Sequence, residues 1–231
     1  WLRPFADLHV LRIHCDQCEE GQISPWTARH LTRAAVVTGW GNENVTLAWT
    51  ILVAELLEDP AVFKVVFICG KTLPLQTFEH AYRALTADAD DWIAPMFKAE
   101  NNPRVRLKSH AWVALSRASA TALCCDGWYP RVARWVAGNL VPWNALTDEY
   151  FAVNVIDWAG LLTNRSRRAV MFVDWGESGS SPWSHREVPA DVLLALLKAK
   201  FAGVLFARKF ERGADVERLR LHDVASAADA E

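Results

Sequence analysis

The sequence of 231 residues lacks the features that identify several common functional classes. No apolar run approaches the roughly 18 residues that a transmembrane helix needs, and the opening "WLRPFADLHV" does not follow the order of a signal peptide. It has no glycine-rich phosphate loop and no G-x-S-x-G elbow. The usual sequence signatures of nucleotide hydrolases and esterases are therefore missing.

The sequence also lacks an excess of positive charge. Lys and Arg total 25, against 27 for Asp and Glu. Nucleic acids and anionic membrane surfaces attract proteins through a basic field, so we expect neither as a partner. A hydrophobic fraction of 52% with 23% charged residues instead indicates an ordinary folded protein of one domain or at most two.

Cysteine is scarce and its number is odd. Cys15 and Cys18 form a single C-x-x-C next to His14, a pattern that suits either a redox pair or half of a zinc site. Because no second C-x-x-C or His pair occurs at ligand spacing, we interpret these cysteines as ordinary thiols. The five cysteines are Cys15, Cys18, Cys69, Cys124 and Cys125.

Short apolar runs alternate with helical patterns along most of the chain. The runs typical of strands are 8–13, 34–38, 62–68, 111–115, 169–175 and 203–207, and the helical patterns are 43–59, 77–87, 116–126, 147–158 and 189–200. Strands separated by helices predict an α/β fold with a mostly parallel central sheet, helices on both faces and ligands at the carboxyl ends of the strands. After residue 210 the composition changes, and 211–231 is expected to form a terminal helix or tail.

The stretch "NALTDEYFAVNVIDW" (144–158) places two acids, Asp148 and Glu149, ahead of an apolar helical pattern. Thr147 suits an N-cap, and acids in the next turn suit the positive end of the helix dipole. On these residues alone, capping is the simplest interpretation of the acidic pair.

Seven segments, one of them within this stretch, follow one another in a characteristic order along residues 8 to 210. Taken together they resemble the core-2/I-branching β-1,6-N-acetylglucosaminyltransferases, with the peptide O-xylosyltransferases and the plant and algal branching-enzyme-like proteins. The segments are "RIHCD" (12–16), "VVTGWGNENVTLAWTILVAELLED" (36–59), "VFICGKTLPLQTFEHAYRAL" (66–85), "KSHAWVALSRASATAL" (108–123), "TDEYF" (147–151), "MFVDWGESGSSPWSHRE" (171–187) and "LFARKF" (205–210).

The resemblance implies a GT-A-like, Rossmann-type nucleotide-sugar fold in residues 1–210. It implies an inverting, metal-independent glycosyltransferase that moves N-acetylglucosamine, xylose or glucuronic acid from a UDP-sugar to a hydroxyl of a glycan or glycoprotein. No cofactor is expected besides the UDP-sugar donor. Such proteins are type II membrane proteins of the Golgi lumen, so a membrane anchor would lie outside these residues. The sequence departs from the family in two places. Thr147 replaces a proline, and only seven residues precede Leu8, where family members carry a further strand ahead of "RIHCD".

Inverting sugar transfer needs a base for the acceptor proton and positive charge for the departing diphosphate. By its match to the family's catalytic glutamate, Glu149 is the expected base, and Asp148 is expected to orient the loop or the acceptor. The resemblance assigns Lys209 and Arg186 to the diphosphate, with Arg208 beside them. It places two further residues at the nucleotide, namely Asp16 and Trp40.

The sequence also contains a literal Asp-x-Asp, formed by Asp88 and Asp90. One interpretation is a divalent cation held on the donor diphosphate. The other is a solvated surface turn in an acidic cluster with Asp91, after the helix that is expected to end near Ala87. Because so short a motif arises easily by chance, we interpret it as a surface turn and expect no metal.

Two other classes of function compete with a transferase. A non-catalytic carbohydrate-binding or scaffold domain could keep the same fold, and UDP titration would separate it from an enzyme. A glycosidase with Asp148 and Glu149 as its carboxylates is disfavoured, because neighbours on a helix point about 100° apart and seldom face each other across a substrate.

Overall fold

The computed structural model describes residues 1–16, 23–39, 42–94, 96–98, 107–124, 147–176, 182–211 and 213–214. The chain divides into two compact units. The larger unit comprises Leu2–Phe67 and Leu85–Arg168, and the smaller unit comprises Trp1, Ile68–Ala84 and Ala169–Glu231.

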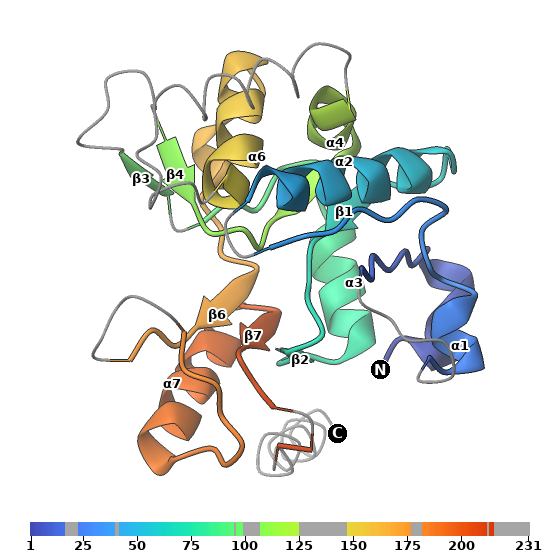
Figure 1. Ribbon diagram of the computed structural model, residues 1–231. Helices are drawn as coiled ribbons and strands as arrows, with labels where there is room; N and C mark the ends of the chain where they lie inside the picture. Colours follow the sequence, from blue (N-terminus) through green and yellow to red (C-terminus); the bar gives the residue numbers. More distant parts are fainter. Residues whose placement is uncertain are drawn as a thin grey trace. The chain divides into compact units, whose positions relative to one another are not determined.

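Three helices pack together in the larger unit, α2 (Glu43–Leu57), α4 (Arg117–Cys124) and α6 (Thr147–Trp158) (Figure 1). Of the three, α4 packs against strands β1 (Lys64–Val66) and β5 (Ala114–Ser116), which pair antiparallel. Six consecutive residues of α6, 151–156, are buried. This confirms the largely buried helix that its apolar sequence predicts. The largest fully buried side chains of this core are Phe151, Ile93, Leu115, Leu123 and Ile156.

The other elements of the larger unit are short. They are the 3₁₀ helices η1 (Arg3–Leu8) and η2 (Asn164–Ser166), helix α1 (Pro25–Ala28), and the antiparallel pair β3 (Met96–Lys98) and β4 (Leu107–Ser109). Strand β4 packs against α6. Strand β4 and helix α6 also carry the two members of the charged pair described below.

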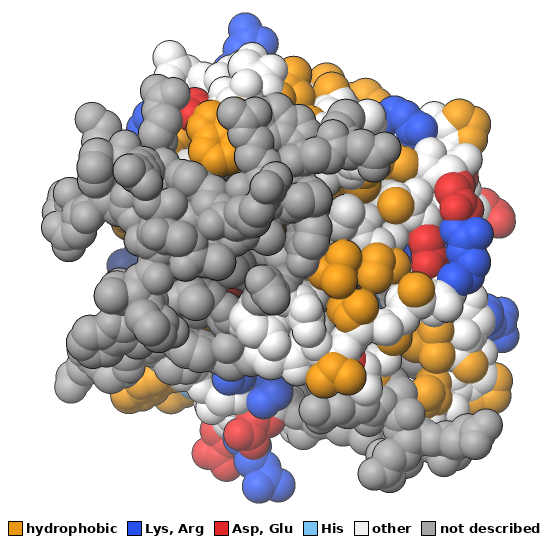
Figure 2. All heavy atoms as spheres, turned by 45° about the horizontal axis from the view of Figure 1, so that its top comes forward, with side chains coloured by type: hydrophobic (Ala, Val, Ile, Leu, Met, Phe, Trp, Pro, Cys, Tyr) orange, Lys and Arg blue, Asp and Glu red, His pale blue; other side chains and the backbone are white. Residues whose placement is uncertain are grey.

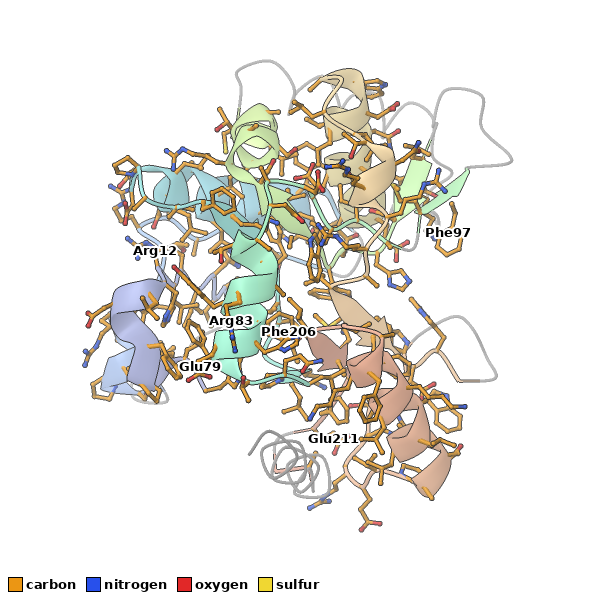
Figure 3. The ribbon with its side chains drawn as sticks, turned by 180° about the vertical axis from the view of Figure 1, so that it is seen from behind. Arg12, Glu79, Arg83, Phe97, Phe206 and Glu211 are labelled. Atoms are coloured by element: carbon orange, nitrogen blue, oxygen red, sulfur yellow. The ribbon has the colours of Figure 1, made fainter. Side chains whose placement is uncertain are left out.

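The smaller unit contains a three-stranded sheet in the order β2 (Thr72–Pro74), β7 (Phe206–Arg208), β6 (Met171–Val173). Strands β2 and β7 are antiparallel, whereas β6 and β7 are parallel. Helix α7 (Ala190–Phe201) packs Leu196 and Ala199 against Ala207 of β7. Most of α3 (Phe78–Thr86) belongs to this unit. The side chain of Phe206, labelled in Figure 3, contacts Trp1 with ring centroids 5.6 Å apart.

The α/β class and all five predicted helices are confirmed, with small shifts at their ends. Four of the six apolar runs contain strands, but 8–13 and 34–38 do not, so those two predictions are wrong. Ile13 makes one isolated bridge, to Leu31. The described strands form three small sheets, in which β6–β7 is the parallel pair and the other three pairs are antiparallel. The mostly parallel sheet expected from the alternation of strands and helices does not appear among them.

The described surface carries charges of both signs. On the described part of the face in Figure 2, Lys and Arg side chains lie among Asp and Glu side chains and do not form a continuous basic area. Among the described residues, no helix combines the length and apolar character needed to span a bilayer.

Arg117 closes the end of α2. Its guanidinium donates to the backbone carbonyls of Leu57 at 2.9 Å, Asp59 at 2.8 Å and Val62 at 3.0 Å. The last carbonyls of a helix have no partner within the helix. A single side chain at the start of α4 therefore satisfies the carbonyls that end α2 and begin the connection to β1.

Replacing Arg117 with alanine is expected to lower the free energy of unfolding by about 2–4 kcal/mol, because three hydrogen bonds from a charged donor are lost together. Urea denaturation would measure the change. The matched control is Arg83→Ala on the exposed face of α3, for which about 0.5 kcal/mol or less is expected. Equal effects of the two substitutions would contradict this role for Arg117.

Asp91 links its own segment to the start of α4 through side-chain hydrogen bonds. Its side chain accepts from the Ser116 amide and from the Ser119 hydroxyl, both at 2.6 Å, and the residue is 3% exposed. Burial raises the pKa of Asp91 above 3.8, and the hydrogen bonds from Ser119 and Ser116 offset this only in part. The folded protein therefore binds this proton more tightly than the unfolded chain does.

This raised pKa predicts a pH dependence of stability. Between pH 3.8 and the folded pKa of Asp91, the folded state holds more protons than the unfolded state, so the contribution of Asp91 to the free energy of unfolding falls as pH rises. Asp91→Asn removes the titrating group. Urea denaturation at a series of pH values would give the free energy of unfolding of both proteins. We expect the value for wild type minus the value for Asp91→Asn to decrease as pH rises. A difference independent of pH would contradict the assignment.

Candidate functional site

Glu149 lies in the first turn of α6 and is paired with a lysine from β4. Its Oε2 atom is 2.8 Å from Nζ of Lys108, and the Glu149 side chain is 13% exposed. The same ammonium group lies 5.9 Å from the ring centroid of Tyr150. The predicted base is thus a mostly buried carboxylate with a charged partner, and its neighbour Asp148 is half-buried as well.

The position of Lys108 follows from a buried asparagine on α6. Asn154 has no exposed surface, and its side chain donates to the carbonyl of Leu107 at 2.7 Å and accepts from the Leu107 amide at 3.3 Å. These two bonds attach β4 to α6 and set the next residue, Lys108, beside Glu149. Sequence reasoning missed both residues. The polar Asn154 inside the apolar "FAVNVI" was the available signal, since buried polar side chains require partners.

The charge of Lys108 is stabilised by its surroundings. Burial opposes the charged form, but the hydrogen bond and charge of Glu149 outweigh it, with smaller contributions from Tyr150 and Asp148, so the pKa of Lys108 is raised. The lysine is therefore a cation at neutral pH. It engages Oε2 of Glu149, and a carboxylate has a second oxygen that can accept a proton.

The two cations predicted to bind diphosphate, Arg186 and Lys209, lie on adjacent segments of the smaller unit. The carbonyl of Lys209, which follows β7, accepts from the amide of His185 at 2.9 Å, and the carbonyl of His185 accepts from the amide of Glu211 at 2.9 Å. A parallel bridge between His185 and Phe210 joins the two segments, so Arg186 and Lys209 each lie next to a bridged residue. Arg186 is exposed and Lys209 half-buried. The third cation, Arg208, ends β7 opposite β2 and β6.

A His–Asp pair that sequence reasoning missed supports this arrangement. His185 is 5% exposed, and its Nε2 lies 2.9 Å from Oδ2 of Asp174. Asp174 also accepts from the amides of Gly176 and Trp183. Gly176 has φ +56°, and a Cβ there would come within 2.2 Å of the Trp183 ring, so only glycine fits at this position beside Asp174.

The carboxylate of Asp16 is hydrogen-bonded to Thr38 of a neighbouring segment. Its Oδ2 accepts from the Thr38 amide at 2.6 Å and the Thr38 hydroxyl at 2.7 Å, and these hydrogen bonds lower the pKa of Asp16. The other residue assigned to the nucleotide, Trp40, lies outside the described residues.

Cys15 is in a disulfide bond, so the interpretation of this cysteine as an ordinary thiol is wrong. Disulfide formation depends on distances in the folded chain, which spacing in sequence does not show.

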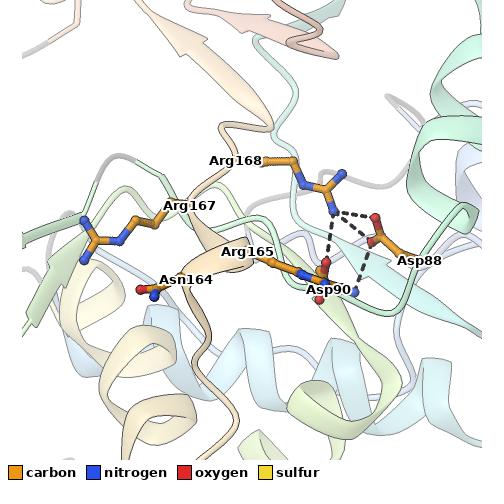
Figure 4. Close-up of a pocket in the computed structure, with 6 residues that line it drawn as sticks. All are labelled: Asp88, Asp90, Asn164, Arg165, Arg167 and Arg168. Carbon is orange, nitrogen blue, oxygen red and sulfur yellow. Dashed lines mark hydrogen bonds and ion pairs between the residues drawn. The ribbon is translucent and has the colours of Figure 1, made fainter.

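The Asp88-Ala89-Asp90 turn is paired with cations. Nη2 of Arg168 lies 2.8 and 2.7 Å from the two carboxylate oxygens of Asp88 and 3.7 Å from Oδ2 of Asp90 (Figure 4). Nζ of Lys64 lies 3.7 Å from Oδ1 of Asp88. Burial opposes ionisation of Asp88, but the hydrogen bond and charge of Arg168 outweigh it, and the pKa of Asp88 is lowered. The sequence suggested a solvated surface turn. Its two carboxylates are instead paired with Arg168 and Lys64.

Within the part of the chain that the structure describes, no three His, Cys, Asp or Glu side chains are grouped so that they could hold a metal ion. A scan of the sequence against models of known protein families finds no match, and a search among curated proteins finds none either.

Proposed function

We propose that this protein is an inverting, metal-independent glycosyltransferase of GT-A-like fold. It transfers N-acetylglucosamine, xylose or glucuronic acid from a UDP-sugar to a hydroxyl of a glycan or glycoprotein, and works in the Golgi lumen as a type II membrane protein anchored outside these residues. The observation that carries the proposal is the bridge between His185 and Phe210. It puts Arg186 and Lys209 on neighbouring segments, as joint contact with one diphosphate requires.

The proposed reaction divides between two sets of side chains. Glu149 takes the proton of the acceptor hydroxyl as that oxygen forms a bond to the anomeric carbon. The bond between the anomeric carbon and the β-phosphate oxygen breaks, and its electron pair leaves with UDP. Lys209 and Arg186 offset the charge that develops on the departing diphosphate, as preorganised cations do at other developing oxyanions.

The geometry around Glu149 fits the role of a base. A general base must keep a lone pair available while it is held in place. Lys108 fixes one carboxylate oxygen at 2.8 Å, and the bonds of Asn154 to Leu107 hold the strand that carries Lys108. The carboxylate is therefore oriented through two elements of the larger unit.

The proposal is tested by measuring UDP release from UDP-N-acetylglucosamine, UDP-xylose and UDP-glucuronic acid with a mixture of glycan acceptors in the presence of EDTA. We expect release from one donor that depends on acceptor and persists in EDTA. Release from none of them, with glycan binding retained, would instead identify a carbohydrate-binding or scaffold domain. Activity that vanishes with EDTA and returns with manganese would contradict the metal-independent mechanism.

A further inference from the structure

The larger unit contains a pocket of about 480 Å³ that none of the residues assigned to sugar transfer lines. Its walls are formed by two acids, one amide and three guanidinium groups, as Figure 4 shows. The lining residues are Asp88, Asp90, Asn164, Arg165, Arg167 and Arg168.

The two acids of the pocket are already matched by two cations. Arg168 binds Asp88 through both carboxylate oxygens and approaches Asp90. Lys64, whose side chain is 2% exposed, lies near Asp88 and donates to the backbone carbonyl of Asp90 at 2.8 Å. The charges of these four residues sum to zero. The remaining cations of the pocket therefore represent an excess of positive charge.

That excess belongs to Arg165 and Arg167. Both are exposed, and among the described residues no Asp or Glu oxygen lies within ion-pair distance of either guanidinium. Figure 4 shows their side chains extending to opposite sides of Asn164. The pocket thus presents two uncompensated cations with a neutral amide between them.

The backbone that carries these donors is fixed. Thr163 and Ser166 form a capping box around η2. The residue Ser166 is 1% exposed, and its backbone carbonyl accepts from the Ile93 amide at 2.7 Å. Two residues later, Arg168 lies over the buried ring of Trp92, 4.5 Å from its centroid. Donors on a fixed backbone lose less conformational freedom when a ligand binds.

We propose that this pocket binds a tetrahedral oxyanion, a phosphate or sulfate group, at the amide of Asn164, and that the exposed side chains of Arg165 and Arg167 turn toward it from either side when it binds. The planar guanidinium matches the oxygen pairs of such groups and donates two hydrogen bonds at once. The group is supplied either as a free ion or as a substituent on a saccharide, whose hydroxyls can donate to the carboxylate of Asp90. This site is independent of the proposed sugar transfer.

The test is isothermal titration calorimetry with sodium sulfate, sodium phosphate, and a sulfated disaccharide with its unsulfated counterpart, each against sodium chloride at equal ionic strength. We expect saturable binding of at least one oxyanion beyond the chloride control. Saturation by the simple salts identifies a site for the free ion, whereas saturation by the sulfated disaccharide alone identifies a site for the substituent. No saturable binding of any of them would overturn the proposal.

The variant to compare is Arg165→Ala/Arg167→Ala, which removes two exposed side chains and breaks no ion pair within the described part of the chain. We expect its affinity for the bound oxyanion to fall by about tenfold or more. Arg29→Ala/Arg83→Ala removes the same charge from exposed positions elsewhere and is expected to leave the affinity unchanged. Equal losses in both double variants would show a general effect of net charge and would overturn the assignment of the pocket.

Discussion

Glu149→Gln is expected to reduce the rate of sugar transfer by a factor of about 10²–10⁴, the usual contribution of a positioned general base. The amide has nearly the same shape as the carboxylate but cannot take the acceptor proton. Binding of UDP should change little, because the carboxylate is assigned to the acceptor and not to the nucleotide. The turnover number from UDP release and the dissociation constant of UDP from calorimetry would be measured on the same preparation.

The same substitution also breaks the ion pair with Lys108, so a second variant is needed. Lys108→Met removes the pair and leaves the carboxylate able to accept a proton. We expect its loss of turnover to be much smaller than that of Glu149→Gln. If the two variants lose turnover equally, Glu149 acts through its ion pair and is not the base, and wild-type turnover in Glu149→Gln would exclude it from catalysis altogether.

Lys209→Ala is expected to weaken UDP binding by about 10- to 100-fold, because a hydrogen bond to a charged group contributes about 1.5–3 kcal/mol. Turnover should fall as well, since the charge on the diphosphate grows as the sugar leaves. Lys198→Ala, on the exposed side of α7 in the same unit, removes the same charge and serves as the control. Equal effects of Lys209→Ala and Lys198→Ala on UDP affinity would contradict the assignment.

Arg186→Ala tests whether the two cations share one ligand. Residues that contact the same group usually give effects that do not add. We expect Lys209→Ala/Arg186→Ala to lose less binding free energy than the sum of the two single losses. Strict additivity would indicate that the two side chains act at separate places.

The helices could be predicted from the sequence because their signals are local. The run from 43 to 59 carries its apolar helical pattern within one segment, and α2 (Glu43–Leu57) forms there. The strands could not be placed equally well, because each described strand is three residues long and is defined by a distant partner. The run 8–13 is as apolar as those that form strands. It makes one bridge, from Ile13 to Leu31, because no described segment runs beside it continuously.

In the candidate site, too, some residues could be predicted from the sequence and others could not. Arg186 and Lys209 were predicted as a pair, and the bridge next to them joins their segments. The supporting contacts were missed, since Asn154 acts on β4 from 47 positions away and His185 meets Asp174 from 11 positions away. Such contacts are properties of the folded chain and have no signature in any one segment.

The most direct measurement for the proposed mechanism is calorimetric titration of the protein with UDP in EDTA, repeated with manganese in excess. If fixed cations take the place of a metal at the diphosphate, UDP binds saturably in EDTA and manganese leaves the dissociation constant unchanged. No saturable binding in EDTA, or binding that appears only with manganese, would contradict that mechanism.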